Sequence, residues 1–289
     1  MSVAAQLPVD AWPNESAHRT LVTRLLRNGD AVAGAAILIV VGGLCVFGPM
    51  LWATAPNAID FGAFNQPPSL HHLMGTDDLG RDEFTRILYG GRISLLVGFS
   101  AMAVGIGFGG LVGALSGWFG GAVDFALMRA VDIALSIPSL FLLLLLSVVI
   151  APSSISIAFV IGAVNWMRPA RLMRAQVLSL KPLEYIEAAY AVGSSPLRIL
   201  FRTVTPNAIS PLIVGGTLLV GHAIVLEAAM SFLGFGIQPP TSSWGNMLTN
   251  AQTFVTNAPW LAFFPGLMVF VTVLGFNLLG DGLRDTLRA

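Results

Sequence analysis

Six long apolar stretches constrain this chain more than any other feature of its sequence. A helix needs about 20 apolar residues to cross the hydrocarbon core of a bilayer. Only 10% of the residues are charged, against about 25% in a soluble domain. The sequence therefore predicts an all-α fold, a polytopic membrane bundle of six transmembrane helices. The expected spans cover roughly residues 31–53, 93–117, 129–150, 154–167, 208–233 and 261–280.

The basic residues predict how these spans are oriented, because cytoplasmic loops carry an excess of Lys and Arg. With a cytoplasmic N-terminus, twelve basic residues lie inside and three, Arg81, Arg86 and Arg92, lie outside. Both termini are then cytoplasmic in a multi-pass protein of the cytoplasmic (inner) membrane. The expected parts are a cytoplasmic tail (1–30), a transmembrane domain (31–289), external loops (54–92 and 234–260) and a cytoplasmic loop (168–207).

Composition argues against several other classes of protein. The apolar spans imply the lipid bilayer as a partner, and the formal net charge of zero suggests no nucleic-acid partner. Residues 1–30 are polar, so the first apolar run is expected to stay as an anchor and not to act as a cleavable signal. The single lysine, Lys181, precedes a proline, whereas a phosphate-binding P-loop ends in a Gly-rich segment and a Lys. We therefore expect no catalytic residues, cofactor or metal in this chain.

One water-soluble segment interrupts the apolar pattern, at residues 181–207. Pro182 suits the first turn of a helix, and Gly193 is placed to end that helix in a left-handed conformation. Ser195 and Pro196 then suit the start of a second helix, which is expected to stop near Pro206. The segment reads as a helical hairpin, either a plain linker on the membrane surface or a docking element for a soluble partner.

The second span carries glycines at every fourth position. This spacing places them on one helical face, where a neighbouring helix can approach to backbone distance. The sequence therefore predicts helix packing at Gly105, Gly109, Gly113 and Gly117.

Ionisable residues within the spans are candidates for function. Arg129 and Asp132 are close enough to pair on one helical face, and Pro138 is expected to kink the third span. His222 and Glu227 are the ionisable residues expected to be most deeply buried. They suggest either proton coupling or side chains that line a water-filled vestibule or bond to neighbouring helices.

The external loops offer two further readings. His71 and His72 lie near Asp77 and Asp78, but their irregular spacing favours a folded polar loop with local ion pairs over a metal site. In the second loop, Trp244 and Trp260 suit the headgroup level of a membrane. The alternative there is a lip that meets an external binding protein.

Several motifs, taken in order, resemble the C-type permease subunit of dipeptide and oligopeptide ABC importers. The resemblance covers about residues 72 to 289. Met230 and Thr85 depart from the usual Leu and Ser of the family patterns. The matching elements are GTD and GRD (75–82), MRxxD and its proline (128–138), the EAA loop (187–193), ExxxSFLG (227–234), PP, SWG and PW (239–260), and NLLGDGLRD (277–285).

The resemblance implies a type I ABC importer permease fold and a set of partners. These are a second, B-type permease, two cytosolic ABC ATPase domains that use ATP and Mg²⁺, and an external substrate-binding protein. It also implies that the hairpin is a coupling helix seated in a groove of the ATPase. The expected coupling residues are Glu184, Glu187, Ala188, Ala189, Gly193, Pro196 and Arg198, and the expected residues of the translocation path or gate are Asp132, His222, Glu227 and Asn277.

Peptide is the expected substrate, with nickel chelates or glutathione as alternatives carried by related importers. Two other classes stay open. A proton-coupled secondary carrier would depend on His222 or Glu227 and need no ATPase. A structural membrane subunit without transport would tolerate changes in the hairpin.

Overall fold

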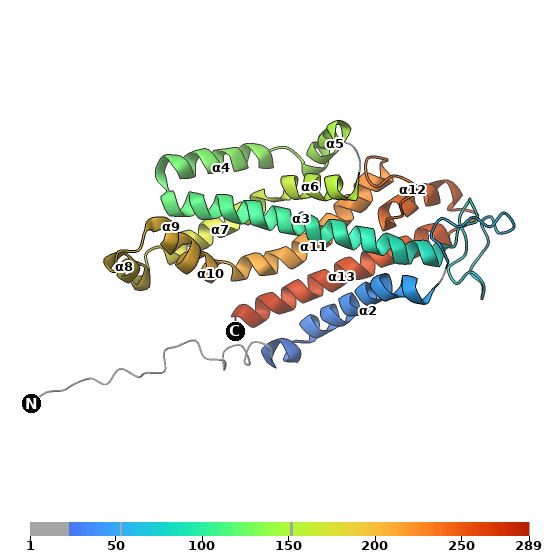
Figure 1. Ribbon diagram of the computed structural model, residues 1–289, viewed down its shortest axis with the longest axis horizontal. Coiled ribbons are helices and arrows are strands. Elements are labelled where there is room, and N and C mark those ends of the chain that lie inside the picture. The colour runs from blue at the N-terminus through green and yellow to red at the C-terminus, as the bar shows by residue number, and fades with distance from the viewer. Residues whose placement is uncertain (1–22, 53, 151–152, 289) are drawn as a thin grey trace, which may run out of the picture.

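The computed structural model describes residues 23–288, apart from residue 53 and residues 151–152. Most of the predicted N-terminal tail, residues 1–22, lies outside the described residues. Within them the fold is all-α, and the sole extended pairing is an isolated bridge between Thr76 and Asp82. The chain is an elongated bundle whose long helices run side by side (Figure 1).

Four helices form the body of the bundle: α2 (Gly29–Leu51), α3 (Glu83–Phe119), α11 (Ser210–Phe232) and α13 (Trp260–Arg288). All four are long and apolar enough to cross a membrane. Backbones approach closely between α2 and α13, where a β-carbon on Gly34 would lie 2.6 Å from the carbonyl oxygen of Gly275. Small residues therefore set the spacing of these helices, as is usual where lipid removes the hydrophobic drive for association.

The third predicted span is broken into two helices. α4 (Gly121–Leu135) and α5 (Ser139–Val149) meet at an angle of 90°. Pro138 stands immediately before α5, where its ring and its missing N–H prevent α4 from continuing. The predicted kink is confirmed, and it is sharper than a bend within one helix.

The fourth predicted span is short. α6 (Ser154–Asn165) starts with a capping box between Ser153 and Ser156. α7 (Met167–Leu180) follows after Trp166, which keeps helical dihedral angles. The described residues thus contain four spanning helices by length and composition, or five if the bent α4–α5 pair is one span. The predicted count of six is not confirmed.

The second span is longer than the apolar pattern predicts, since α3 begins at Glu83 and not at residue 93. Asp82 caps it by accepting a hydrogen bond from the backbone N–H of Thr85 at 2.8 Å. The 37 residues of α3 correspond to about 55 Å, well beyond a hydrocarbon core of about 30 Å. The polar first turns of α3 therefore lie beyond the apolar zone, which is why hydropathy alone misplaced its start.

Three of the spaced glycines on α3 lie against α7. A β-carbon on Gly109 would collide with the carbonyl oxygen of Trp166, and one on Gly113 with that of Ala170. At Gly117 the carbonyl oxygen of Arg174 would lie 2.9 Å away. Gly105 faces α6, with the carbonyl oxygens of Gly162 and Asn165 at 3.6 Å. The glycine face of α3 therefore follows the α6–α7 run at backbone distance.

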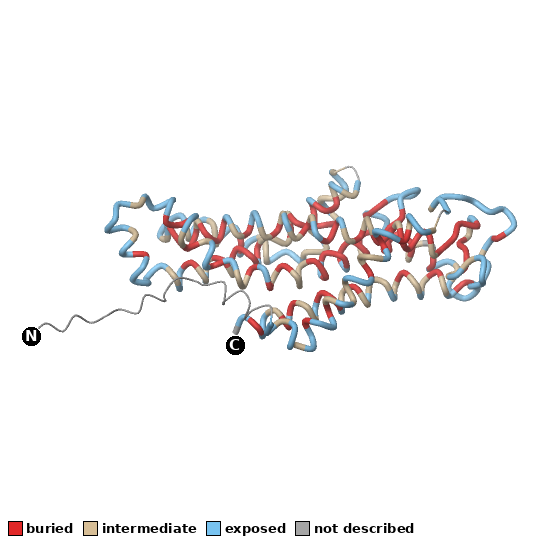
Figure 2. Tube along the Cα trace, turned by 60° about the horizontal axis from the view of Figure 1, so that its bottom comes forward, coloured by how far each residue is buried: buried red, intermediate tan, exposed pale blue. Residues whose placement is uncertain are grey.

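The two ends of the bundle differ. At one end lie α8 (Glu184–Ala191), α9 (Pro196–Ile199), the π-helical turn η1 (Leu200–Val204) and α10 (Thr205–Ala208). At the other end lie the long loop before α3 and the helix α12 (Trp244–Phe254) (Figure 1). Buried residues run through the middle of the bundle, whereas the turn after α8 is exposed (Figure 2).

Candidate coupling and gating sites

The hairpin has the left-handed turn that its sequence predicts. Gly193 has φ of +84°, its N–H donates to the carbonyl of Tyr190 at 2.9 Å, and Ser194 N–H donates to that of Ala189 at 3.1 Å. These bonds satisfy carbonyls at the end of α8. A β-carbon on Gly193 would have no atom within 4 Å, so the turn restricts this position by its backbone conformation alone.

The ends of the hairpin helices differ in detail from the sequence prediction. α8 begins at Glu184, after Leu183, so Pro182 precedes the helix instead of occupying its first turn. Pro196 does open α9, but the side chain of Ser195 makes no capping hydrogen bond. The second helix continues through η1 and α10 to Ala208 instead of stopping near Pro206.

The base of the hairpin is fixed to the bundle. Ile186, on α8, is buried in one apolar cluster with Ile199, Leu200, Met173 and Trp118. In addition, Lys181 Nζ donates to the carbonyl oxygen of Trp118 at 2.6 Å, and the Trp118 and Tyr190 rings are stacked 6.3 Å apart. The apolar cluster therefore joins α8 to α3, which carries Trp118, and to α7, which carries Met173.

The outer face of the hairpin is unoccupied within the described part of the chain. Val192 is 87% exposed and Leu197 52% exposed. Acidic side chains lie on the same segment. The predicted coupling residues Glu184, Glu187, Ala188, Gly193, Pro196 and Arg198 are exposed, and Ala189 is half-buried. The segment combines a fixed base with a free apolar and acidic tip.

Two arginines on α7 hold the broken helix α4. Arg174 Nε and Nη2 each lie 2.6 Å from a carboxylate oxygen of Asp124, which also accepts a hydrogen bond from Ser116. These bonds to Asp124 raise the pKa of Arg174. Arg171 lies 2.5 Å from Asp132. The predicted pair between Arg129 and Asp132 is therefore wrong, because the partner of Asp132 comes from another helix.

Arg129 instead packs over the ring of Phe125, with its guanidinium carbon 5.3 Å from the ring centroid. Spacing along one helix is consistent with a local pair, but only the packing of α7 against α4 brings Arg171 and Arg174 to the acids. These interhelical partners lie 39 and 50 residues from their acids in sequence. A motif confined to one helix gives no signal for them.

Glu227 is fully buried, at 0% exposure, and accepts three hydroxyl hydrogen bonds. The donors are Ser94 at 3.0 Å, Ser231 at 2.7 Å and Ser243 at 2.8 Å. Ser243 is the N-cap of α12, and its neighbour Trp244 donates its backbone N–H to Ser94. Glu227 thus joins α3, α11 and α12 through one closed network, which favours the reading that it bonds to neighbouring helices.

The indole of Trp244 is buried at 0% exposure, and its Nε1 donates to the carbonyl of Ile87 at 3.0 Å. Trp244 therefore lies within the packing of α12 on α3, and its predicted position at the headgroup level stays a prediction. Trp260 is half-buried, and its Nε1 donates to the carbonyl of Thr76 at 3.3 Å. Both tryptophans connect the two predicted external loops, 54–92 and 234–260.

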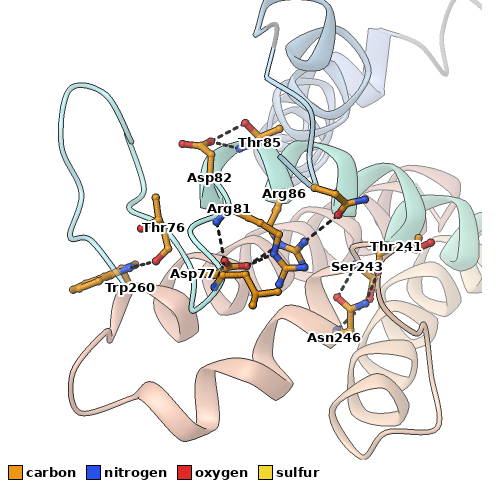
Figure 3. A network of polar contacts seen from close by, with 12 residues as sticks. Thr76, Asp77, Arg81, Asp82, Thr85, Arg86, Thr241, Ser243, Asn246 and Trp260 are labelled. Carbon is orange, nitrogen blue, oxygen red and sulfur yellow. Dashed lines mark hydrogen bonds and ion pairs between the residues drawn. The ribbon is translucent and has the colours of Figure 1, made fainter. Parts of the chain in front are cut away.

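The predicted first external loop folds around buried ion pairs at the start of α3. Asp77 lies 2.7 Å from Arg81 Nε and 3.6 Å from Arg86 Nε, and all three side chains are buried. Figure 3 shows these three converging, with Asp82 and Thr85 bonded beside them. His72 Nδ1 lies 3.0 Å from Asp82. The loop is a folded polar structure with local ion pairs, as the sequence predicts, although Asn65 Oδ1, Asp78 Oδ1 and Glu83 Oε1 are buried without a hydrogen-bond partner among the described residues.

The other predicted path residues lie in different surroundings. Asn277, on α13, and Asp132 are exposed, and Glu227 is enclosed. His222 is exposed and lines a cavity beside α11, so the expectation that it is among the most buried ionisable residues is wrong. Arg168 lines the same cavity. The sequence predicted only that Arg168 belongs to the cytoplasmic loop (168–207), and no motif indicated that it lines a cavity.

The fold and these motifs define a multi-pass membrane permease, and comparison with known proteins identifies its family. Residues 109–289 match the family of binding-protein-dependent transport system inner membrane components, and the chain belongs to this family. Residues 18–68 match the N-terminal transmembrane domain of oligopeptide transport permease C. Within the family, the chain is a C-type permease subunit of the dipeptide and oligopeptide ABC importer type.

Curated relatives extend over nearly the whole chain. A dipeptide transport system permease protein from Alkalihalophilus pseudofirmus is 39% identical, covering 97% of this chain and 92% of the relative. The oligopeptide transport system permease protein of Bacillus subtilis is 38% identical over 91% and 87%. A probable D,D-dipeptide transport system permease protein of Escherichia coli is 39% identical over 92% and 90%.

Proposed function

We propose that this chain is one permease subunit of an ATP-driven importer that moves peptides across the cytoplasmic membrane. The hairpin carries this proposal. Its base is locked to α3 and α7 through Ile186, while Val192 is 87% exposed. A segment that is fixed at its base and exposed at its tip suits a docking element that a soluble partner binds and moves. The names of the relatives, which describe dipeptide and oligopeptide transport, support peptide as the cargo.

The proposed complex contains a second, B-type permease, two cytosolic ABC ATPase domains and an external peptide-binding protein. ATP and Mg²⁺ bind to the ATPase domains. Closure of the ATPase pair moves α8, and the buried cluster around Ile186 passes that motion to α3 and α7. The cytoplasmic halves of the spans then swing, and the path opens to the outside. This orientation keeps the hairpin and both termini in the cytoplasm.

The importer proposal can be tested with the chain in its native membrane. The chain is affinity-purified under mild detergent, every co-purifying chain is identified, and the complex is reconstituted in liposomes for uptake of a labelled dipeptide. We expect a second permease, P-loop ATPases and uptake that requires ATP. Uptake driven by a proton gradient without ATP would overturn the proposal in favour of a secondary carrier. A chain that purifies alone and moves no peptide would indicate a structural subunit.

A further inference from the structure

A cavity of about 360 Å³ lies where two helical runs are interrupted. Its walls come from the α4–α5 break, the α6–α7 junction and α11. The volume lies within the range of pockets that bind small molecules. Four polar side chains contribute to the lining: Ser139, Asn165, Arg168 and His222.

The cavity lies beside the middle of α11, a helix long and apolar enough to cross a membrane. His222 is twelve residues from the start of α11 at Ser210 and ten from its end at Phe232, or about 18 Å and about 15 Å along the axis. Arg168 borders the same cavity as His222. A cation at such depth is costly unless it faces water or a partner, and it marks a substrate or ion pathway by default.

Arg168 differs from the two arginines that follow it on α7. Arg171 and Arg174 each pair with an acid on α4. Arg168 is exposed to the cavity, and among the residues that the structure describes it has no recorded ion pair or hydrogen bond. No Asp or Glu belongs to the described lining of the cavity. The guanidinium is therefore an uncompensated positive charge.

The start of α5 adds to this positive field. Ser139 is its first residue, and no side chain caps its N-terminus with a hydrogen bond. The α5 dipole therefore places partial positive charge at the wall of the cavity. Free N–H groups at such an end, together with an Arg, form an arrangement that binds carboxylates.

We propose that this cavity receives the carboxylate end of the peptide during its passage. The inference rests on the proposed function, in that it takes the cargo to be a peptide with a free carboxyl group. Arg168 supplies paired donors to the carboxylate, the Ser139 hydroxyl donates a further hydrogen bond, and His222 borders the site. The break at Pro138 is then functional, because it brings the start of α5 to the cavity instead of a continuous, fully bonded helix.

The charge of the cavity can be measured without transport. Ser139→Cys is introduced, and the complex in membranes is labelled with an anionic sulfonatoethyl or a cationic trimethylammonium-ethyl methanethiosulfonate reagent. The native Cys45 is fully buried, so the unsubstituted chain serves as the blank. We expect faster labelling by the anionic reagent, and an additional Arg168→Gln change should lower the anionic-to-cationic rate ratio about tenfold.

Arg171→Gln is the matched control, because it removes an arginine of the same helix that is paired outside the cavity. It should leave the labelling ratio unchanged. Equal ratios with and without Arg168 would overturn the proposal. So would the absence of labelling by both reagents in nucleotide-free and ATP-bound complexes, because the cavity would then be closed to water.

Transport provides the second readout. With saturating binding protein, Arg168→Gln should lower the maximal uptake of a peptide acid on the order of tenfold, and uptake of the same peptide as an amide much less. The half-saturating concentration should stay unchanged, and Arg168→Lys should restore part of the rate. An unchanged acid-to-amide ratio would overturn the carboxylate site alone. If the wild-type complex moves no peptide, the proposed function fails, whereas the labelling result still reports the charge of the cavity.

Discussion

Gly113 on α3 lies so close to the carbonyl oxygen of Ala170 on α7 that a β-carbon on the glycine would overlap it. Gly113 lies between Gly109 and Gly117 on the glycine face of α3. This face packs against α7, the helix that precedes the hairpin. Backbone cannot withdraw as a flexible side chain can, so this position accepts no larger residue without moving α7. The close spacing of α3 and α7 thus depends on the missing side chain at Gly113, together with those at Gly109 and Gly117.

Gly113→Ala should therefore destabilise the permease by about 1 to 3 kcal/mol, because it overpacks a helix interface. Thermal unfolding of the purified complex, followed by size-exclusion chromatography after heating, measures the change. Gly107→Ala is the control, since a β-carbon there meets no atom within 4 Å. It should be neutral or slightly stabilising, because Ala favours the helix over Gly. Equal melting temperatures for the two variants would contradict the assigned packing.

Gly193→Val should uncouple ATP hydrolysis from peptide uptake. The left-handed φ of +84° costs a residue with a side chain about 1 to 2 kcal/mol, and the strain is greatest for a β-branched one. The measurement is the number of peptides taken up per ATP hydrolysed in proteoliposomes. Gly193→Asn is the control, because Asn tolerates this conformation. Wild-type stoichiometry in the valine variant would count against the turn as part of the coupling element.

Glu227→Ala should severely destabilise the packing of α12 on α3 and α11, whereas Glu227→Gln should have a smaller effect on stability. Alanine leaves three buried serine hydroxyls without their acceptor, at about 1 to 3 kcal/mol each if none finds a new partner. Glutamine retains one carbonyl acceptor. Thermal stability measures this difference. Peptide uptake by the Gln variant should still require ATP and should need no proton gradient. If the Gln variant takes up no peptide and uptake by the wild type depends on a proton gradient, the protein is a secondary carrier.

The Asp124–Arg174 pair should stabilise the protein more than the Asp132–Arg171 pair. The first has two hydrogen bonds at 2.6 Å and side chains 21% and 34% exposed, whereas those of the second are 46% and 53% exposed. Double-mutant cycles with Asn and Gln replacements measure both coupling energies. We expect about 0.2 to 1 kcal/mol for the exposed pair and a larger value for Asp124–Arg174. The reverse order would contradict the geometry of α4 on α7.

Local patterns predicted much of the fold. Apolar runs indicated the four long helices but not the count of six, Pro138 predicted a kink where α4 and α5 meet, and Gly193 predicted the left-handed turn. The polar first turns of α3 hid its start at Glu83, because hydropathy reports only the part of a helix that contacts lipid. The prolines of the hairpin also did not mark the helix ends as predicted, since Pro206 lies inside α10 and not at the end of a helix.

The sites depended more strongly on contacts between distant segments. Glu227 was singled out as an acid within a span, but its three donors come from α3, α11 and the start of α12. His222 was singled out likewise, but only helix packing shows that it is exposed at a cavity with Arg168. No spacing in the sequence connects these residues.

The sequence by itself determined that this is a helical membrane protein with a polar hairpin, because span length and turn chemistry are local properties, and its motifs indicated the permease family. The tertiary structure decided which charges are paired and which are free. It joined Arg171 and Arg174 to acids on α4 and left Arg168 facing the cavity. The physical reason is that the cost of a charge depends on its surroundings, and in this bundle those surroundings come from helices far apart in the chain.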